Sequence, residues 1–254
     1  MHMTLAIALL LGAAAISPAG TSWVDLTYDM SSETLYWPTG QGFDWGKVSW
    51  GKNPEGLWYA AGKYCTVEHI GTHVDAPIHF CETGISVEQL PLERLIGKAA
   101  VIDVRPQCKD SIDYRLTVED IKADEARNGR IEPGSVVLML TGWGERWPNW
   151  ERYYGTPTPK DTATLHFPSF SVEAAGFLVE ERQAVAVGLD NASIDYGQSK
   201  TFEVHRYVNA KGVYGIENVA NLEKLPPRGA EIWVLPIRIK GGSGAPARIV
   251  ARLP

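Results

Sequence analysis

Three histidines and an aspartate are concentrated in one short stretch of this 254-residue chain, from His69 to His79. The stretch reads His-Ile-Gly-Thr-His-Val-Asp-Ala-Pro-Ile-His and holds three of the six histidines of the chain. Imidazole and carboxylate groups are common ligands of Zn²⁺ and Mn²⁺, so His69, His73 and Asp75 would supply three ligands from one segment. We interpret His79, at the end of the stretch, as an acid/base rather than a ligand.

The stretch has to bend if its residues are to share an ion. Residues four apart in an extended strand are about 13 Å from each other, whereas two ligands with bonds of about 2.1 Å must approach within a few Å. Gly71, Pro77 and three β-branched residues argue against a helix. We therefore expect a tight turn leaving a strand, with backbone freedom at Gly71 and a stiff exit at Pro77.

The same residues resemble a known signature. They match every fixed position of the His-x-Gly-Thr-His-x-Asp-x-Pro-x-His motif of the cyclase superfamily of metal-dependent hydrolases, which includes bacterial-type kynurenine formamidase, isatin hydrolase and some lactone-opening enzymes. The similarity extends from about Trp23 to the C-terminus. It implies a single α/β domain over residues 20–254, with a mixed β-sheet and the swivelling β/α/β fold of the family.

The resemblance also implies a second metal ion. In kynurenine-formamidase-like members this ion takes a histidine and a glutamate twelve residues later, and His205 and Glu217 have that spacing. Asp75 would bridge the two ions, because a carboxylate has two oxygens. We therefore expect two divalent ions per chain, Zn²⁺ or Mn²⁺, with His69, His73 and Asp75 on the first and Asp75, His205 and Glu217 on the second.

The predicted reaction is hydrolysis of an amide bond. A divalent ion lowers the pKa of bound water toward 7 and polarises a carbonyl, so hydroxide can attack without a protein nucleophile; no Gly-x-Ser-x-Gly motif is present. His79 would pass the proton to the leaving nitrogen. The resemblance favours an aryl formamide such as N-formylkynurenine as substrate, with isatin-type lactam or lactone opening as the alternative. A metal-binding structural protein without activity is the non-enzymatic alternative, against which the intact His79 argues.

Candidate substrate contacts come from two regions. Residues 35–59 form a long segment, expected to be irregular, that carries Trp37 and three further tryptophans. Such a segment fits a packed flap or dimer contact as well as an aryl-binding wall, and Trp37 is our candidate for the wall. Gln198 and Ser199, in a polar loop after an expected strand, are the other candidates.

Hydrophobic patterning predicts more strands than helices. Strands are expected over residues 22–28, 64–69, 99–104, 135–140, 184–189, 232–239 and 248–252. Helices are expected over residues 117–128, with a capped start and a glycine stop, and over residues 171–182.

Composition restricts the partners and the compartment. A net charge of −6 and the lack of a basic run make nucleic acid an improbable partner, and we expect a small aromatic substrate, no membrane insertion and a homo-oligomer, a dimer or larger. Three cysteines without a C-x-x-C spacing indicate neither a disulfide framework nor a thiolate zinc site. Residues 1–19 have the length of a signal peptide or apolar N-terminal segment, which favours a secreted or periplasmic protein over a cytoplasmic one.

Overall fold

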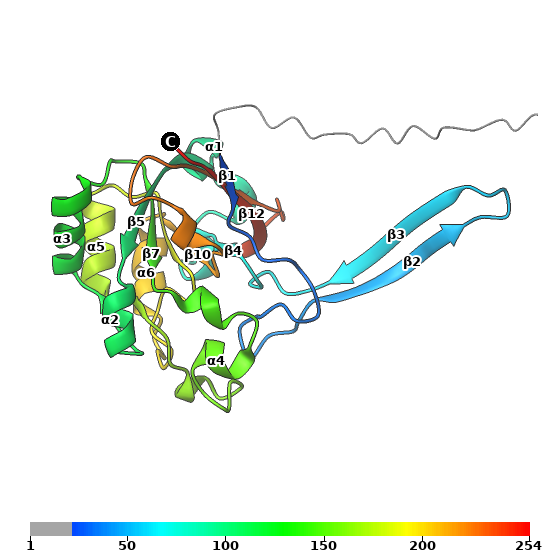
Figure 1. The fold of residues 1–254 in the computed structure, drawn as a ribbon, viewed down its shortest axis with the longest axis horizontal. Coiled ribbons are helices and arrows are strands. Elements are labelled where there is room, and N and C mark those ends of the chain that lie inside the picture. The colour runs from blue at the N-terminus through cyan, green and yellow to red at the C-terminus, as the bar shows by residue number, and fades with distance from the viewer. Residues whose placement is uncertain (1–21) are drawn as a thin grey trace, which may run out of the picture.

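The structure, a computed structural model, describes residues 22–254 and shows a single α/β domain with one protruding hairpin (Figure 1). The segment 1–19, interpreted above as a signal peptide, lies outside the described residues. The predicted α/β class with a mixed sheet is confirmed. The strands are β1 Trp23–Asp25, β2 Asp44–Lys52, β3 Trp58–Cys65, β4 His73–Asp75, β5 Ile96–Asp103, β6 Arg115–Leu116, β7 Val136–Leu140, β8 Ser169–Phe170, β9 Ala186–Leu189, β10 Tyr214–Glu217, β11 Glu231–Pro236 and β12 Gly244–Arg252. The α-helices are α1 Leu92–Leu95, α2 Arg105–Asp110, α3 Val118–Asn128, α4 Trp150–Tyr154, α5 Val172–Glu180 and α6 Glu203–Ala210.

The main sheet closes on itself through its shortest internal strand. Its order is β1-β12-β11-β5-β7-β9-β10-β4, and β4 also pairs with β12. The strands β5, β7, β9 and β10 run parallel to one another, whereas every pairing that involves β4, β11 or β12 is antiparallel. The three residues of β4 are therefore held from both sides, by β10 and by β12, and all three are buried.

Apolar side chains form a core on each face of this sheet. One core fills the inside of the closed sheet and includes Val74, Leu138 and Ile216. The other lies between the sheet and the helices α3, α5 and α6, where Ile121 and Leu178 are fully buried (Figure 1). Burial on both faces explains why the strand β7 is a continuous apolar run, as parallel strands between two layers require.

Several predicted elements are confirmed. The helix α3 begins after Thr117, whose hydroxyl accepts a hydrogen bond from Asp120 N in a capping box, and ends at Gly129. The predicted strands near residues 99–104, 135–140, 184–189, 232–239 and 248–252 correspond to β5, β7, β9, β11 and β12, and the helix over 171–182 corresponds to α5. Among the described residues, no helix is both long and apolar enough to cross a bilayer.

Three expectations about local structure were wrong. Residues 35–59 are not irregular throughout, because the twisted hairpin of β2 and β3 takes up residues 44–65 (Figure 1). The strand expected over 64–69 ends at Cys65, and the strand that carries ligands comes after the turn, as β4. The helix α6 was not predicted; it follows the region that was assigned to a polar loop.

Candidate metal centre

The closing strand β4 brings two of the predicted ligands next to a third. In the antiparallel register with β10, His73 lies opposite Glu217 and Asp75 lies opposite Gly215. A Cβ atom at position 215 would be 3.0 Å from Asp75 Oδ2, so the glycine there leaves the room that the carboxylate occupies. Barrel closure thus places residues about 140 positions apart in the chain on one buried surface.

The turn before β4 has the predicted bend. Gly71 has a φ of 55°, a left-handed conformation that favours glycine. Its carbonyl accepts a hydrogen bond from Asn218 Nδ2 at 2.8 Å, and Thr72 Oγ1 donates to Asn218 O at 2.6 Å. The turn is therefore tied to the residue that follows Glu217, which fixes both ligand segments relative to each other.

The five predicted metal ligands form one cluster with Asp75 at its centre. Its Oδ1 lies 2.6 Å from His69 Nδ1 and 3.2 Å from His73 Nε2, and its Oδ2 lies 3.4 Å from His205 Nε2. Glu217 completes the group, 3.5 Å from His73 Nε2 and 3.2 Å from His205 Nε2. Ligands with bonds of about 2.1 Å to one ion lie roughly 3 Å apart, so these separations suit shared divalent ions.

The buried imidazoles expose a lone pair to the centre of this cluster. His73 Nδ1 donates to Gly71 O at 2.9 Å, and His205 Nδ1 donates to Asp195 Oδ2 at 2.7 Å. In each ring the proton is therefore held on Nδ1, and Nε2 faces the carboxylates. His73 Nε2 is buried and has no hydrogen-bond partner, which is costly unless a cation takes its lone pair.

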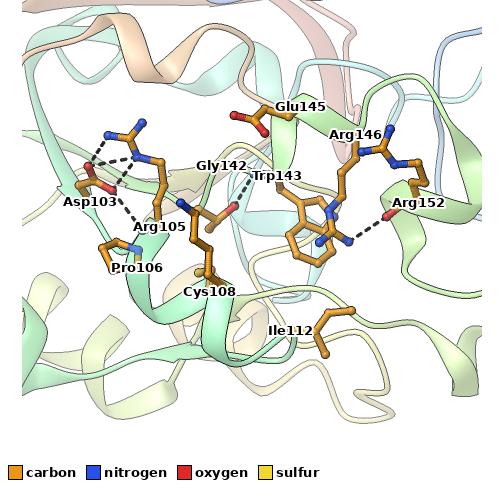
Figure 2. A pocket seen from close by; sticks show the side chains of 12 residues that line it. Asp103, Arg105, Pro106, Cys108, Ile112, Gly142, Trp143, Glu145, Arg146 and Arg152 are labelled. Carbon is orange, nitrogen blue, oxygen red and sulfur yellow. Dashed lines mark hydrogen bonds and ion pairs between the residues drawn. The ribbon is translucent and has the colours of Figure 1, made fainter.

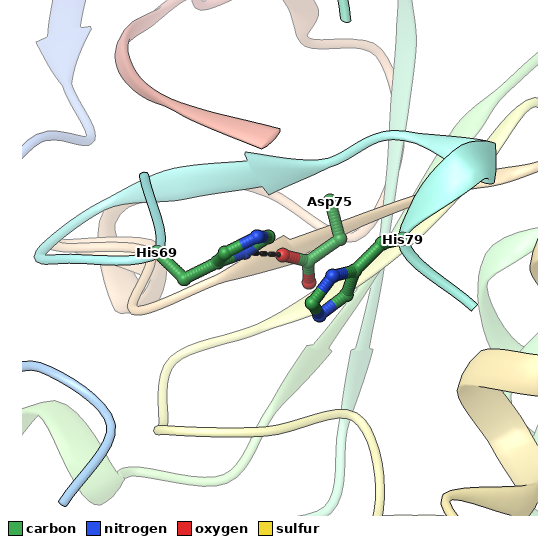
Figure 3. Close-up of side chains that lie close together, drawn as sticks. All are labelled: His69, Asp75 and His79. Atoms are coloured by element: carbon green, nitrogen blue, oxygen red, sulfur yellow. Dashed lines mark hydrogen bonds and ion pairs between the residues drawn. The ribbon is translucent and has the colours of Figure 1, made fainter. Parts of the chain in front are cut away.

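His69 is also oriented by a hydrogen bond, but through its other ring nitrogen, Nε2. Ser243 Oγ donates to Glu68 Oε2 at 2.6 Å, so it accepts from His69 Nε2 at 2.9 Å and leaves Nδ1 facing Asp75. The His79 ring stacks on His69, with centroids 3.9 Å apart (Figure 3). Ligand atoms of His69, Asp75 and His79 lie within 4.8 Å of one another, so the position of His79 also suits a ligand.

The electrostatics of the cluster favour a bound cation. Burial lowers the pKa of His73, but the negative charge of Asp75 beside it outweighs this effect and raises the pKa to about 9. Burial raises the pKa of Asp75, but the charge of His73, followed by the nearby His205 and His69, holds this pKa well below its usual value. Asp75 is thus ionised in a buried site and raises the pKa of the neighbouring His73. Such a carboxylate would bind a divalent ion strongly.

A pocket of about 200 Å³ opens onto the cluster. Trp37 lines it, as the sequence predicts for a substrate-contacting residue. Three further aromatic walls, Phe80, Tyr154 and Phe202, were not predicted; Phe80 directly follows His79, which is the one signal that could have identified it.

Gln198 and Ser199 do not line this pocket. Gln198 Nε2 lies 2.7 Å from His166 Nδ1, and Ser199 Oγ accepts from Phe202 N at 3.0 Å. Their predicted contact with substrate stays a prediction. In the structure, Ser199 supports the backbone of the pocket wall at Phe202. Sequence reasoning did not single out Asp195, which lies in the loop after β9 and orients His205.

A larger cavity, of about 630 Å³, lies elsewhere, beside α2 and the segment 141–152 (Figure 2). Its lining carries arginines and a lysine but no histidine, and its acidic side chains are Asp103 and Glu145. A divalent cation has no comparable ligand set there. The smaller pocket is therefore the candidate active site.

A closed mixed sheet with a buried cluster of three histidines, an aspartate and a glutamate at the floor of an aromatic pocket defines a metal-dependent hydrolase. The chain belongs to the Cyclase family, whose profile matches residues 24–196. Isatin hydrolase of Roseibium aggregatum is 32% identical over 196 residues, 74% of this chain and 72% of that protein. Kynurenine formamidase of Bacillus mycoides is 26% identical over 235 residues, 91% of this chain and 98% of that protein. The solved structure of isatin hydrolase A from Ralstonia solanacearum superposes with a TM-score of 0.84 at 31% identity, covering 92% of each chain.

These relatives confirm the prediction of a hydrolase over the non-catalytic alternative. They also confirm the predicted family.

Proposed function

We propose that this protein hydrolyses an amide bond attached to an aromatic ring, and that a compact lactam of the isatin type is its first candidate substrate. The observation that carries this proposal is the pocket over the cluster of candidate metal ligands. This pocket is small and has Trp37, Phe80 and Phe202 in its walls. Flat aromatic walls bind a flat aromatic substrate by stacking and by exclusion of water. The named activity of two isatin hydrolase relatives agrees with this substrate class.

The charge of the pocket favours a lactam over N-formylkynurenine. The residues that line it in the described part of the chain include no arginine and no lysine. N-formylkynurenine carries an amino-acid carboxylate, which would lose its hydration without gaining a counter-ion on these walls. An aryl formamide stays the second candidate, because the kynurenine formamidase relative aligns with 91% of the chain.

We propose that two ions, Zn²⁺ or Mn²⁺, bind and share Asp75. His69, His73 and Asp75 would hold one, and Asp75, His205 and Glu217 the other. The buried, unpartnered Nε2 of His73 and the convergence of five ligand side chains support this assignment. Imidazole and carboxylate ligands accept both metals, so donor type does not select between them.

The chain's own groups would handle the proton. When bound, a divalent ion lowers the pKa of water and polarises the substrate carbonyl. Burial lowers the pKa of His79 to about 3, so its imidazole is neutral at physiological pH, which is the protonation state that a base requires. The hydroxyl of water would join the carbonyl carbon, the carbon–nitrogen bond would break, and His79 would return the proton to the leaving nitrogen.

Turnover of the two candidate substrates tests the proposal. Purified protein loaded with Mn²⁺ or Zn²⁺ should consume isatin, followed by its visible absorbance, faster than N-formylkynurenine at equal concentration. His73→Ala, which removes a ligand without touching the aromatic walls, should abolish both reactions. Faster turnover of N-formylkynurenine would reverse the order of the two candidates, and no turnover of any aryl amide or lactam by metal-loaded protein would refute the proposal.

A further inference from the structure

The cavity beside α2 lies past the carboxyl ends of two neighbouring parallel strands. The strand β5 ends at Asp103 and β7 ends at Leu140, and these two residues pair in the parallel register. Residues that directly follow each strand line the cavity, among them Arg105 and Gly142 (Figure 2). Ligands of α/β proteins commonly bind in the crevice beyond such strand ends, and a volume of about 630 Å³ is in the range of small-molecule sites. The cavity shares no lining residue with the metal pocket, so it is a separate space.

Basic side chains outnumber acidic ones around this cavity, although the whole chain has a net charge of −6. Asp103 is already paired with Arg105, at 2.6 Å from Oδ2 to Nη2. The other acidic side chain of the lining is Glu145. Three basic side chains of the lining form no ion pair with any carboxylate among the described residues: Lys109, Arg146 and Arg152. The cavity therefore contains positive charges that lack a counter-ion within the chain.

Arg146 is held at the cavity by an aromatic ring and a carbonyl group. The central carbon of its guanidinium lies 3.5 Å from the centre of the Trp143 ring, and Nη1 donates to Arg152 O at 3.1 Å. Trp143 is only 2% exposed, and its Nε1 donates to Tyr153 O at 2.6 Å, which fixes the ring. A guanidinium that is already ordered on a fixed ring loses little freedom when it binds a ligand, and this favours binding.

Most hydrogen-bond donors of Arg146 and Arg152 are free for a ligand. A guanidinium has five N–H donors. In the described part of the chain, the guanidinium of Arg146 makes one hydrogen bond and that of Arg152 makes none. Burial lowers the pKa of Arg146, and repulsion from Arg152 lowers it further. An anion that accepts hydrogen bonds from both groups would offset this repulsion.

Apolar surface is also exposed in the lining. Pro106 and Cys108 lie on α2, and Ile112 follows the end of that helix. The side chain of Ile112 is 42% exposed. An inorganic anion would leave this surface in contact with water, whereas an organic acid with an apolar body would cover it. The lining thus favours a ligand that combines one negative group with an apolar part.

We infer that this cavity binds a small organic acid, whose carboxylate is held by Arg146 and Arg152 and whose apolar body lies against Pro106 and Ile112. Guanidinium groups bind carboxylates through paired, charge-assisted hydrogen bonds. Lys109 adds a further positive charge at the same cavity. The inference does not depend on the reaction at the metal centre, because the two sites share no residue.

Protection of single arginines in metal-loaded wild-type protein tests this site. Phenylglyoxal modifies accessible guanidinium groups, and mass spectrometry of peptides measures the modification of each arginine separately. Benzoate, the probe for an organic acid, should slow the modification of Arg146 and Arg152 severalfold. Arg130 is the internal control, because it is exposed, precedes β7 and so lies toward the opposite edge of the sheet, and donates only to Glu181 O, at 3.3 Å. Its modification should not respond to benzoate, and benzoate bound at the metal centre would not affect this readout.

Substitution of either arginine measures its share of the binding. In Arg146→Gln, the benzoate concentration that half-protects Arg152 should rise about tenfold or more, because hydrogen bonds to charged groups are strong. In Arg152→Gln, the concentration that half-protects Arg146 should rise by a similar factor. Arg130→Gln is the matched control and should protect both arginines at the wild-type concentration. Circular dichroism verifies that each variant is folded.

Inorganic phosphate separates the organic acid from a simple oxyanion. Phosphate should protect Arg146 and Arg152 only at higher concentrations than benzoate, because it gains nothing from the apolar part of the lining. Protection by phosphate at a lower concentration than benzoate would contradict the assignment to an organic acid. Protection by neither anion, or equal protection of Arg130, would overturn the site itself.

Discussion

Replacing Asp195 by asparagine should disable the metal centre without removing a ligand. Asp195 Oδ2 accepts a hydrogen bond from His205 Nδ1 at 2.7 Å, which leaves His205 Nε2 facing the cluster with a lone pair. Asp195 Oδ1 accepts from Val204 N at 2.9 Å at the start of α6. An asparagine has one oxygen acceptor and one NH₂ donor. If the oxygen keeps the contact with Val204 N, the NH₂ group donates to His205 Nδ1 and moves the ring proton to Nε2, where it blocks the metal.

The size of the effect follows from the kind of contact that is lost. Changing a carboxylate that orients a metal-binding histidine typically costs 10–100-fold in metal affinity, or about 1.4–2.8 kcal/mol. The free energy of unfolding of the metal-free protein should fall by only about 1 kcal/mol, because the bond from Val204 N to Oδ1 is retained and only the bond from His205 N to Oδ2 is lost. Competition with a fluorescent zinc chelator gives the affinity, and thermal unfolding with EDTA gives the stability.

Glu203→Gln is the matched control. Glu203 is exposed in the first turn of the same helix, so this change removes a similar charge near the helix start without touching His205. Its metal affinity should equal that of wild type. If Asp195→Asn also binds metal as wild type does, the tautomer argument fails and His205 is not oriented by this carboxylate.

Three further substitutions test other parts of the centre, and one chemical modification tests the burial of Cys108. His73→Ala should lose bound metal and activity together, as measured by elemental analysis and turnover, and full metal content in this variant would contradict its role. His79→Ala should keep its metal while kcat falls about 10²-fold; loss of metal instead would make His79 a ligand, which its stacking on His69 also permits. Glu217→Ala should reduce the metal content from near two ions per chain to near one, because the second ion would lack a ligand; an unchanged content would refute the two-ion assignment. Burial raises the pKa of the Cys108 thiol to about 12, so iodoacetamide at pH 8 should modify it only after unfolding, and rapid modification of native protein would show that the thiol is accessible.

The ligands of the centre could be predicted because their signal is local. Three of the five candidate ligands fall within the stretch 69–79, and the bend at Gly71 follows from residue types that do not favour a helix. His205 and Glu217 have no local signal of this strength. Their spacing carries meaning only beside the family motif, and the structure supplies the reason, since the register of β10 against β4 sets Glu217 opposite His73.

The hairpin of β2 and β3 could not be predicted because its strands lack the usual pattern. Alternation of buried and exposed residues identifies a strand that packs on a core, but β2 and β3 are exposed along most of both faces. Their tryptophans and glycines therefore resembled an irregular loop.

The helix α6 was missed for a related physical reason. Its N-terminal amide groups are capped by Asp195, eight residues before the helix begins at Glu203, rather than by a neighbouring Ser, Thr, Asp or Asn of the kind that marks helix starts in a sequence. The carboxylate of Asp195 therefore fixes both the start of the helix and the orientation of the His205 ring. Since Asp195 follows β9 and Glu217 ends β10, parallel pairing of these two strands brings the orienting carboxylate and the second carboxylate ligand to the same edge of the sheet. The metal centre is thus built where the sheet closes, and its geometry depends on that closure more than on any single segment.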